Sequence, residues 1–387
     1  MLHKTDKKIA FYDKIKGKNS IIYNGELFDT IDNSLLDDMF KRPYNHEYIL
    51  VPHVGNDIEN NYKKYIENIQ KIKLLTNDKI NMFRTGTYSN TALCVFNDIN
   101  KIKAEKIQDF EISFLNNGGG VRFAKQYQGK AFKYDICSYY PSIMNSKKLK
   151  IPLREGILTT ITTEDINKFK TLKYGIYNVK IDCNDKIKFT LQKSNMYTHI
   201  EVNYAKKLKL KIEVLGQHLL YEQKDLISCH NIFGSFVTYL FDLKLKDKVF
   251  KNILNCLWGS IVAKSGGMRK TKISYTDIDP TKYEIIKMTP IDNDTCEILI
   301  KYPVLFYRNN FARLNAFLLG FARINMHKTF ELIGRENIVF SHTDSMITSK
   351  RIDFNRIPFG NGKLGKWTYE GASNNCIVNN MNKYKFN

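Results

Sequence analysis

Two aspartates each stand where a β-rich run gives way to a turn or a helix, and this arrangement constrains the fold more than any other feature. Asp135 lies in the run Ala131–Ile136, and the following segment Ser138–Met144 has a serine and a proline placed to open a helix. Asp344 lies in the turn of a hairpin predicted over residues 337–348. Strands of one sheet can bring such carboxylates to one point even though they are about two hundred residues apart in the sequence.

A basic stripe on a helix is the second pattern. The stretch 233–258 has helical periodicity, and Gly259 is placed to end it. Its basic face, opposite an apolar one, comprises Lys244, Lys248 and Lys251. Phosphoryl transfer needs both carboxylates that hold divalent ions and cations that neutralise phosphates. Each feature alone is weak, because strand-end aspartates often only form turns and lysine stripes often only face solvent.

Periodicity also predicts the elements around these two patterns. Residues 1–110 alternate short strands, such as Tyr48–Val51, with lysine-rich helices, such as Asn61–Leu75. The run Asn116–Gly120 breaks this alternation and indicates a first domain border. A further buried helix is predicted over Ala316–Ile333.

The charge balance indicates a polyanionic partner. The 387 residues include 60 basic and 39 acidic residues, a formal net charge of +21. Such an excess is typical of nucleic-acid-binding proteins, although a coding bias towards lysine has the same effect. The seven cysteines are scattered without a CxxC pair, which argues against a disulfide framework or a zinc ribbon and predicts buried free thiols.

The sequence predicts no membrane segment and an intracellular, cytoplasmic-type reducing compartment. The longest apolar run, near Leu314–Ala322, is too short to cross a bilayer. Met1–Ala10 is rich in lysine and lacks the apolar core of a secretory signal.

Three segments occur in the order in which family B DNA polymerases carry their motifs A, B and C. Tyr134–Ile143 (YDICSYYPSI) resembles motif A, DxxSLYPS, and Lys251–Gly259 (KNILNCLWG) resembles motif B, KxxxNSxYG. Phe340–Ser345 (FSHTDS) resembles motif C, YxDTDS. Asn117–Gly120 is similar to the YxGG loop ahead of the palm in this family. Further matches are Leu364–Trp367 with Glu370, and Lys383–Tyr384, which resembles a shortened KxY element.

The resemblance implies an α+β polymerase palm, an antiparallel sheet with helices, that carries an inserted helical fingers region and follows an N-terminal α/β region. The implied regions are 1–110 in the position of a 3′–5′ exonuclease, 111–202 as palm with motif A, 203–262 as fingers with motif B, and 263–387 as palm with motif C. No thumb is expected. Only Asn24–Asp29 (NGELFD) loosely echoes an exonuclease motif, so no proofreading is expected.

The resemblance also implies roles for single residues. Asp135 and Asp344 would hold two Mg²⁺ ions, with Mn²⁺ as an alternative and the Ile136 carbonyl as a third ligand. Tyr140 would be a steric gate against the ribose 2′-hydroxyl. The residues implied in nucleotide binding are Ser138, Tyr139, Tyr140, Lys244, Lys251, Asn255 and Trp258. Those implied in contacts with primer or template DNA are Gly118, Gly119, Gly120, Gly259, Lys366, Lys383 and Tyr384.

Departures from the family pattern leave alternatives open. His342 replaces the first aspartate of motif C, and Cys256 and Trp258 replace the usual Ser and Tyr of motif B. We expect an active DNA-directed DNA polymerase that binds template, primer and dNTPs; the alternative is a degenerate relative that only binds DNA. Tyr140 and the motif B wording disfavour a reverse transcriptase or an RNA polymerase. Because the YxGG-like and KxY-like elements resemble those of protein-primed viral and linear-plasmid enzymes, a terminal protein is a further candidate partner. Because no thumb is expected, a separate thumb-bearing polypeptide is another.

Overall fold

The chain divides into two compact units. The computed structural model describes residues 6–15, 18–23, 26–28, 48–52, 57–115, 118–281 and 283–386. The first unit comprises residues 1–101 and 235–260, and the second comprises residues 102–234 and 261–387. Residues 235–260, which belong to the predicted fingers region, therefore group with the N-terminal part of the chain. Of the segment that echoes an exonuclease motif, only Glu26–Phe28 lies within the described residues.

The first unit combines a small mixed sheet with helices. The strands lie in the order β3-β2-β1-β4, with β1 and β4 parallel and the other neighbours antiparallel. The strand predicted near residue 48 and the helix predicted to end at residue 75 are confirmed. The elements are β1 (Lys8–Ile15), β2 (Lys18–Tyr23), β3 (Glu26–Phe28), β4 (Tyr48–Pro52), α2 (Ile58–Leu75), α3 (Met82–Thr85) and α4 (Tyr88–Ile99).

The stretch that the sequence predicts as one basic helix is two helices. Helix α9 (Cys229–Lys246) ends before Asp247, and α10 (Lys251–Ile261) begins after a short 3₁₀ turn (Lys248–Phe250). The Asp247 carboxylate accepts a hydrogen bond from the N–H of Val249 at 3.0 Å. Asp247 therefore caps the new turn, as short polar side chains do where a helix starts.

Within α10 the predicted division into two faces is confirmed. The exposed face carries Lys251 and Asn255, and the buried face comprises Ile253, Leu254 and Leu257. Lys244 belongs to α9, so the prediction of one continuous lysine stripe is wrong. The predicted stop at Gly259 is also wrong, because α10 continues to Ile261.

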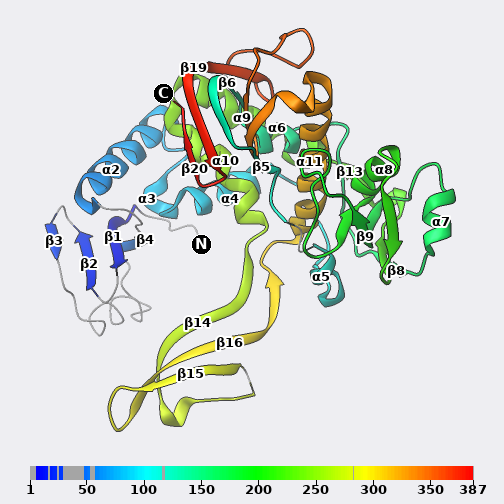
Figure 1. The fold of residues 1–387 in the computed structure, drawn as a ribbon. Helices are drawn as coiled ribbons and strands as arrows, with labels where there is room; N and C mark the ends of the chain where they lie inside the picture. The colour runs from blue at the N-terminus through cyan, green and yellow to red at the C-terminus, as the bar shows by residue number, and fades with distance from the viewer. Residues whose placement is uncertain are drawn as a thin grey trace. The chain divides into compact units, whose positions relative to one another are not determined.

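A six-stranded antiparallel sheet in the second unit carries both aspartates. The strands lie in the order β20-β19-β6-β18-β17-β5, and Figure 1 shows β19 and β20, in red, beside β6. The strand predicted around Asp135 and the hairpin predicted around Asp344 are confirmed. The strands are β5 (Arg122–Ala124), β6 (Tyr127–Ile136), β17 (Ile338–His342), β18 (Ser345–Thr348), β19 (Trp367–Asn380) and β20 (Lys383–Lys385).

A long buried helix, α11 (Leu314–Ile333), confirms the helix predicted over 316–333 and packs against α6 and α8. A second antiparallel sheet has the order β10-β9-β12-β8, and β11 pairs with β9. Strands β7 and β13 form a separate pair, and β14, β16 and β15, in that order, form a third sheet. The remaining elements are α5 (Ile112–Leu115), α6 (Tyr139–Met144), β7 (Lys150–Pro152), β8 (Ile157–Thr159), α7 (Thr163–Lys168), β9 (Gly175–Asp182), β10 (Met196–Thr198), α8 (His199–Lys207), β11 (Lys211–Val214), β12 (His218–Leu220), β13 (Leu226–Ser228), β14 (Lys264–Ser274), β15 (Glu284–Pro290) and β16 (Thr295–Tyr307).

Two arginines of the second unit are buried in ion pairs. The guanidinium of Arg313 donates to both carboxylate oxygens of Glu111, at 2.9 and 2.6 Å. Arg323 lies 2.8 Å from a carboxylate oxygen of Glu201, and both side chains are 1% exposed. A buried charge is tolerated only when it is paired and hydrogen-bonded, so each pair fixes the elements that it joins.

Buried histidines make the stability of the second unit depend on pH. The Nδ1–H of His327 donates to the carbonyl of Ile187 at 3.0 Å, and its Nε2 accepts from the hydroxyl of Thr190 at 2.8 Å. The ring is fully buried, which disfavours its protonated form. Burial lowers the pKa of His327 from 6.5 to about 4 and lowers the pKa of His199 to about 4 as well.

We expect the free energy of unfolding of this unit to fall as the pH is lowered from 6.5 to 5. The unfolded histidine binds a proton near pH 6.5 and the folded one only near pH 4, so the unfolded state holds more protons across this window. At pH 5 this loss corresponds to about 2 kcal/mol per histidine, and the full depression, about 3 kcal/mol, is reached only below pH 4.

Urea titrations at pH 7.5, 6.5 and 5 test this expectation. Trp367, which is 2% exposed, reports on the second unit by fluorescence in a Trp258→Phe background. His327→Gln should flatten the pH dependence. Equal stability at pH 7.5 and pH 5 would contradict the prediction.

No described helix is long and apolar enough to cross a membrane. All seven cysteines are free thiols, which confirms that part of the prediction. Burial is complete only for Cys229, Cys296 and Cys376, and the other four are half-buried.

Candidate active site

The six-stranded sheet brings Asp135 and Asp344 together. In the ladder between β6 and β18, Asp135 is directly opposite Ser345, the residue that follows Asp344. The N–H of Ile136 donates to the carbonyl of Asp344 at 2.9 Å. Directly opposed residues of antiparallel strands have Cα atoms about 5 Å apart. The two half-buried aspartates, one near the end of β6 and one in the turn before β18, are therefore close together along the backbone of the sheet.

Asp344 lies on a tight turn held by main-chain hydrogen bonds. Its N–H donates to the carbonyl of His342 at 2.8 Å, which closes a three-residue turn around Thr343. Thr343 has φ of 61°, a conformation that strains a β-branched residue. The N–H of Thr343 donates to the carbonyl of Val121 at 2.8 Å. Val121, which directly follows the glycines, thus holds the strained turn in place.

Gly120 allows the chain to approach this turn closely. A β-carbon on Gly120 would lie 3.1 Å from the Cα of Thr343, tighter than an ordinary contact with main chain. The glycine loop, which we define as residues 118–120, is thereby packed against the turn that carries Asp344. This contact joins the YxGG-like segment to motif C within one unit.

The glycine loop is also fixed at its other end. The N–H of Gly118 donates to the side-chain carbonyl of Gln192 at 3.1 Å. The guanidinium of Arg323 donates to the carbonyls of Gly118 and Gly119, at 3.3 and 2.9 Å. Asn117, which the sequence pattern groups with these glycines, lies outside the described residues. The buried pair of Arg323 with Glu201 therefore positions the loop as well as the core.

The residues that follow Asp135 form a rigid corner. Ser138 has φ of 48°, unusual for a residue other than glycine, and precedes α6. The buried hydroxyl of Tyr139 donates to the carbonyl of Ala322 at 2.7 Å, which anchors α6 to α11. The rings of Tyr139 and Tyr140 are stacked with centroids 5.9 Å apart. Burial first, and then the charge of Asp344, raises the pKa of Tyr140 to about 12, so its hydroxyl stays protonated at neutral pH.

A short segment closes the other side of β6. The N–H of Cys137 donates to the carbonyl of Lys366 at 3.0 Å, and the N–H of Gly365 donates to the carbonyl of Cys137 at 2.8 Å. Gly365 has φ of 70°, and a β-carbon there would lie 2.7 Å from the Cβ of Ser142 in α6. Glycine is needed here both for its conformation and for its small size.

We expect Gly365→Ala to lower the free energy of unfolding by about 3 kcal/mol, from the left-handed backbone and the steric overlap together. Gly362→Ala is the matched control, because Gly362 also has φ of 70° but a β-carbon there would have no atom within 4 Å. The control should lose only about 1 kcal/mol. Urea unfolding followed by the fluorescence of Trp367 measures both, and equal losses would refute the packing argument.

The other predicted residues of this unit are more open. Lys366 is half-buried, whereas Lys383 is exposed. Tyr384 is 46% exposed, and its ring lies 4.5 Å, centroid to centroid, from that of Phe340. His342 is exposed and is paired with Arg122 and Ser345 in the ladders of β17.

The motif B residues belong to the first unit. On α10, Lys251, Asn255 and Gly259 are exposed and Trp258 is half-buried. The ammonium of Lys244, on α9, lies 5.1 Å from the centroid of the Phe241 ring. Lys251, Asn255 and Gly259 recur at every fourth position and so share one face of α10.

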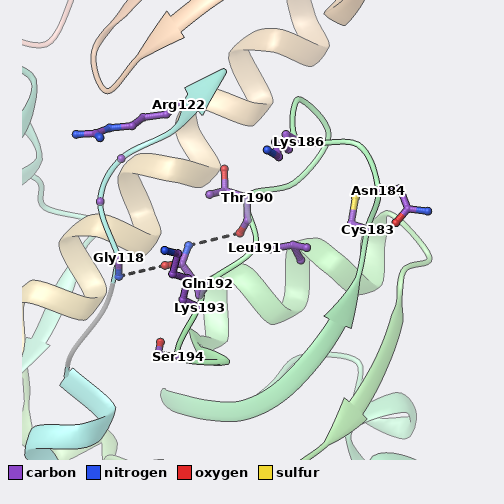
Figure 2. Close-up of a pocket in the computed structure, with 12 residues that line it drawn as sticks. Gly118, Arg122, Cys183, Asn184, Lys186, Thr190, Leu191, Gln192, Lys193 and Ser194 are labelled. Atoms are coloured by element: carbon purple, nitrogen blue, oxygen red, sulfur yellow. Dashed lines mark hydrogen bonds between the residues drawn. The ribbon is translucent and has the colours of Figure 1, made fainter. Parts of the chain in front are cut away.

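A pocket beside the glycine loop was not predicted from any motif. It has a volume of about 800 Å³, and its lining includes Arg122 and residues between 183 and 194. Figure 2 shows Gly118 and Arg122 on one side of it and the loop from Cys183 to Ser194 on the other. In the sequence, the signal that could have indicated this pocket was the basic and polar composition of the loop from Cys183 to Ser194.

Comparison with known proteins finds solved structures with a similar fold. No family model matches the chain, and no curated protein matches it. Solved structures of Phi29 DNA polymerase resemble it. The complex with single-stranded DNA has a TM-score of 0.58 and 15% identity, and the match covers 89% of this chain and 62% of that one. This chain thus spans less than two thirds of that structure's length.

Two further complexes of the same enzyme give similar values. The ternary complex with primer-template DNA and incoming nucleotide substrates has a TM-score of 0.54 and 14% identity, over 95% of this chain and 70% of that one. The post-translocation binary complex with primer-template DNA has a TM-score of 0.59 and 15% identity, over 97% and 74%. The likeness concerns the fold, a mixed helix and sheet architecture that includes an antiparallel sheet.

Proposed function

We propose that this chain is a DNA-directed DNA polymerase that adds deoxynucleotides to a primer 3′-hydroxyl by two-metal phosphoryl transfer. The observation that carries the proposal is the strand ladder that sets Asp135 opposite Ser345 and bonds Ile136 to Asp344. The order of the three motifs supports it. So does the likeness of the fold to Phi29 DNA polymerase, whose structures contain DNA and nucleotides.

Asp135 and Asp344 would hold two Mg²⁺ ions, with Mn²⁺ as the alternative and the Ile136 carbonyl as a third ligand. Among the described residues, no group of three or more His, Cys, Asp or Glu side chains could hold a metal ion. A pair of carboxylates fits Mg²⁺, which in polymerases is bound by one or two carboxylates together with substrate phosphates and water. Bound there, the ions would activate the 3′-hydroxyl and neutralise charge on the transferred phosphate.

The surrounding residues would bind and select the nucleotide. Tyr140 is held by its stacking on Tyr139, which is itself anchored to α11, so its ring would be a rigid gate under the sugar. Ser138 and Tyr139 would complete the nucleotide site in this unit. The proposed nucleotide contacts of the first unit are Lys244, Lys251, Asn255 and Trp258. The proposed DNA contacts are Gly118, Gly119, Gly120, Gly259, Lys366, Lys383 and Tyr384.

A second candidate function is DNA binding without synthesis, by a degenerate relative of these polymerases. The observation that favours it is His342, which is exposed at the position where motif C carries an acid. This candidate predicts salt-sensitive binding of DNA without incorporation of nucleotides.

Extension of a 5′-labelled primer on a DNA template, with dNTPs and either Mg²⁺ or Mn²⁺, separates the two. Metal-dependent extension that EDTA abolishes would support the polymerase and exclude the degenerate relative. Binding without extension in either metal would favour the second candidate. A terminal protein and a thumb-bearing polypeptide are the proposed additional partners. Synthesis that starts without an oligonucleotide primer would identify the terminal protein.

A further inference from the structure

The pocket beside the glycine loop has the charge of an anion site. Three cations line it, Arg122, Lys186 and Lys193, and no Asp or Glu is among the described residues that line it. All three side chains are exposed. Asp185 lies on the same loop outside the lining, and its carboxylate, which accepts a hydrogen bond from the N–H of Ile187 at 3.0 Å, keeps its negative charge. The lining thus carries a formal charge of +3 from three basic residues.

Neutral groups add contacts suited to a nucleic-acid strand. Asn184 and Ser194 contribute an amide and a hydroxyl, and Leu191, which is 47% exposed, contributes an apolar surface. A β-carbon placed on Gly119 would meet nothing within 4 Å, so this residue of the glycine loop faces open space. Sites for single-stranded nucleic acid combine a cationic groove for the backbone with side chains, most often aromatic, against which the bases pack. In this pocket the cationic groove is the part that is present, and Leu191 is the apolar side chain beside it.

The loop that carries the two lysines is anchored from behind. His327 bonds both Ile187 and Thr190 from the buried face of α11. The N–H of Gln192 donates to the hydroxyl of Tyr197 at 2.9 Å, and its side-chain carbonyl accepts from Gly118. Figure 2 shows this bond between Gly118 and Gln192 at the wall of the pocket. The cations therefore project from a fixed scaffold, which lowers the entropic cost of binding.

The pocket is continuous with the turn that carries Asp344. Gly120 lines the pocket and also packs against Thr343, one residue before Asp344. Arg122, at the pocket's edge, is paired with His342 in the ladder of β5 and β17. A strand held in the pocket would therefore lie next to the turn that carries Asp344.

We propose that this pocket binds the phosphodiester backbone of a single DNA strand, with Arg122, Lys186 and Lys193 as phosphate contacts. The proposal deepens the proposed function, on which it rests for the identity of the strand. A free nucleoside triphosphate is the less suitable occupant, because such ligands bind with Mg²⁺ held by carboxylates, and the described lining offers none.

The test is the binding of a fluorescein-labelled oligothymidylate, measured by anisotropy in EDTA so that no catalysis occurs. Lys186→Gln/Lys193→Gln should weaken binding about 25-fold at 0.1 M salt, because each phosphate contact on a single strand contributes a slope of about 0.7 in log K against log salt. The slope itself should fall by about 1.4. Lys168→Gln/Lys170→Gln, which removes the same charge from exposed positions outside the pocket, should change affinity less than threefold.

Three outcomes would overturn the proposal. The first is equal affinity for the pocket variant and the control variant. The second is an equal loss of affinity for a blunt duplex, which would indicate a general electrostatic effect. The third is displacement of the labelled oligothymidylate by dTTP at concentrations at which dTTP itself binds the pocket. This result would assign the site to a free nucleotide. Circular dichroism and the fluorescence of Trp367 verify that each variant is folded.

Two measurements, oligothymidylate binding and primer extension, separate this proposal from the proposed function. If intact protein fails to extend a primer but oligothymidylate binding depends on Lys186 and Lys193, the pocket stands and the polymerase activity fails. If Asp344→Asn abolishes extension while the pocket variant binds the oligonucleotide like intact protein, the activity stands and the pocket fails.

Discussion

Asp344→Asn is expected to lower the rate of primer extension by about three orders of magnitude while leaving the fold intact. The substitution removes one of two carboxylates proposed to hold the metal ions, and several kcal/mol of transition-state stabilisation depend on those ions. The main-chain bonds of Asp344 to Ile136 and His342 do not involve its side chain, so the turn should persist. Asp135→Asn should have a comparable effect for the same reason.

Asp353→Asn is the matched control for this prediction. Asp353 is exposed in the same unit, and its side chain accepts a hydrogen bond from the N–H of Asn355 that an asparagine can also accept. Single-turnover extension with excess enzyme measures the rate, and anisotropy in EDTA shows that DNA binding is unchanged. Extension by Asp344→Asn at a rate within threefold of the intact protein would remove this residue from the active site.

Arg323→Met is expected to lower the free energy of unfolding of the second unit by about 3–5 kcal/mol. The substitution leaves Glu201, which is 1% exposed, without its counter-charge, and breaking one side of a buried pair has this cost. It also removes both hydrogen bonds to the glycine loop. We therefore expect weaker binding of single-stranded DNA even under conditions where the variant is fully folded.

Two variants isolate the cause of this loss. Arg335→Met cuts a partly exposed pair with Glu331, 3.7 Å apart, and should cost less than about 1 kcal/mol. The double variant Arg323→Met/Glu201→Met removes both buried charges and should be more stable than Arg323→Met alone. Urea titrations with Trp367 as the fluorophore, in the Trp258→Phe background, measure all three. A double variant less stable than the single one would contradict the charge argument.

The strands and turns around the two aspartates could be predicted because local signals agree there. A β-rich run before Asp135, a serine and a proline after it, and the polar turn around Asp344 each indicate the element that the structure contains. The buried face of α10 follows from helical periodicity in the same way. The predicted roles of single residues in metal, nucleotide and DNA binding stay predictions.

Long-range features had no comparable signal. The break at Asp247 went unpredicted because the residue can either cap a turn or sit on a helix surface, and periodicity does not distinguish the two. The two buried ion pairs join residues 202 and 122 positions apart, and nothing local to Arg313 or Arg323 marks them as buried. The pocket went unpredicted for a similar reason, since its lining comes from two separate segments.

The pairing of β6 with β18 has a consequence for how such a chain can diverge. The offset between Asp135 and Asp344 is specified by backbone amides and carbonyls, which every residue except proline supplies. Mutational drift can therefore replace neighbours such as His342 without displacing either acid. Side-chain identity matters instead at the positions where the surroundings leave no room, such as Gly120 and Gly365. A similar fold is therefore compatible with sequences that agree at only 14–15% of positions, as in the comparison with the Phi29 DNA polymerase structures.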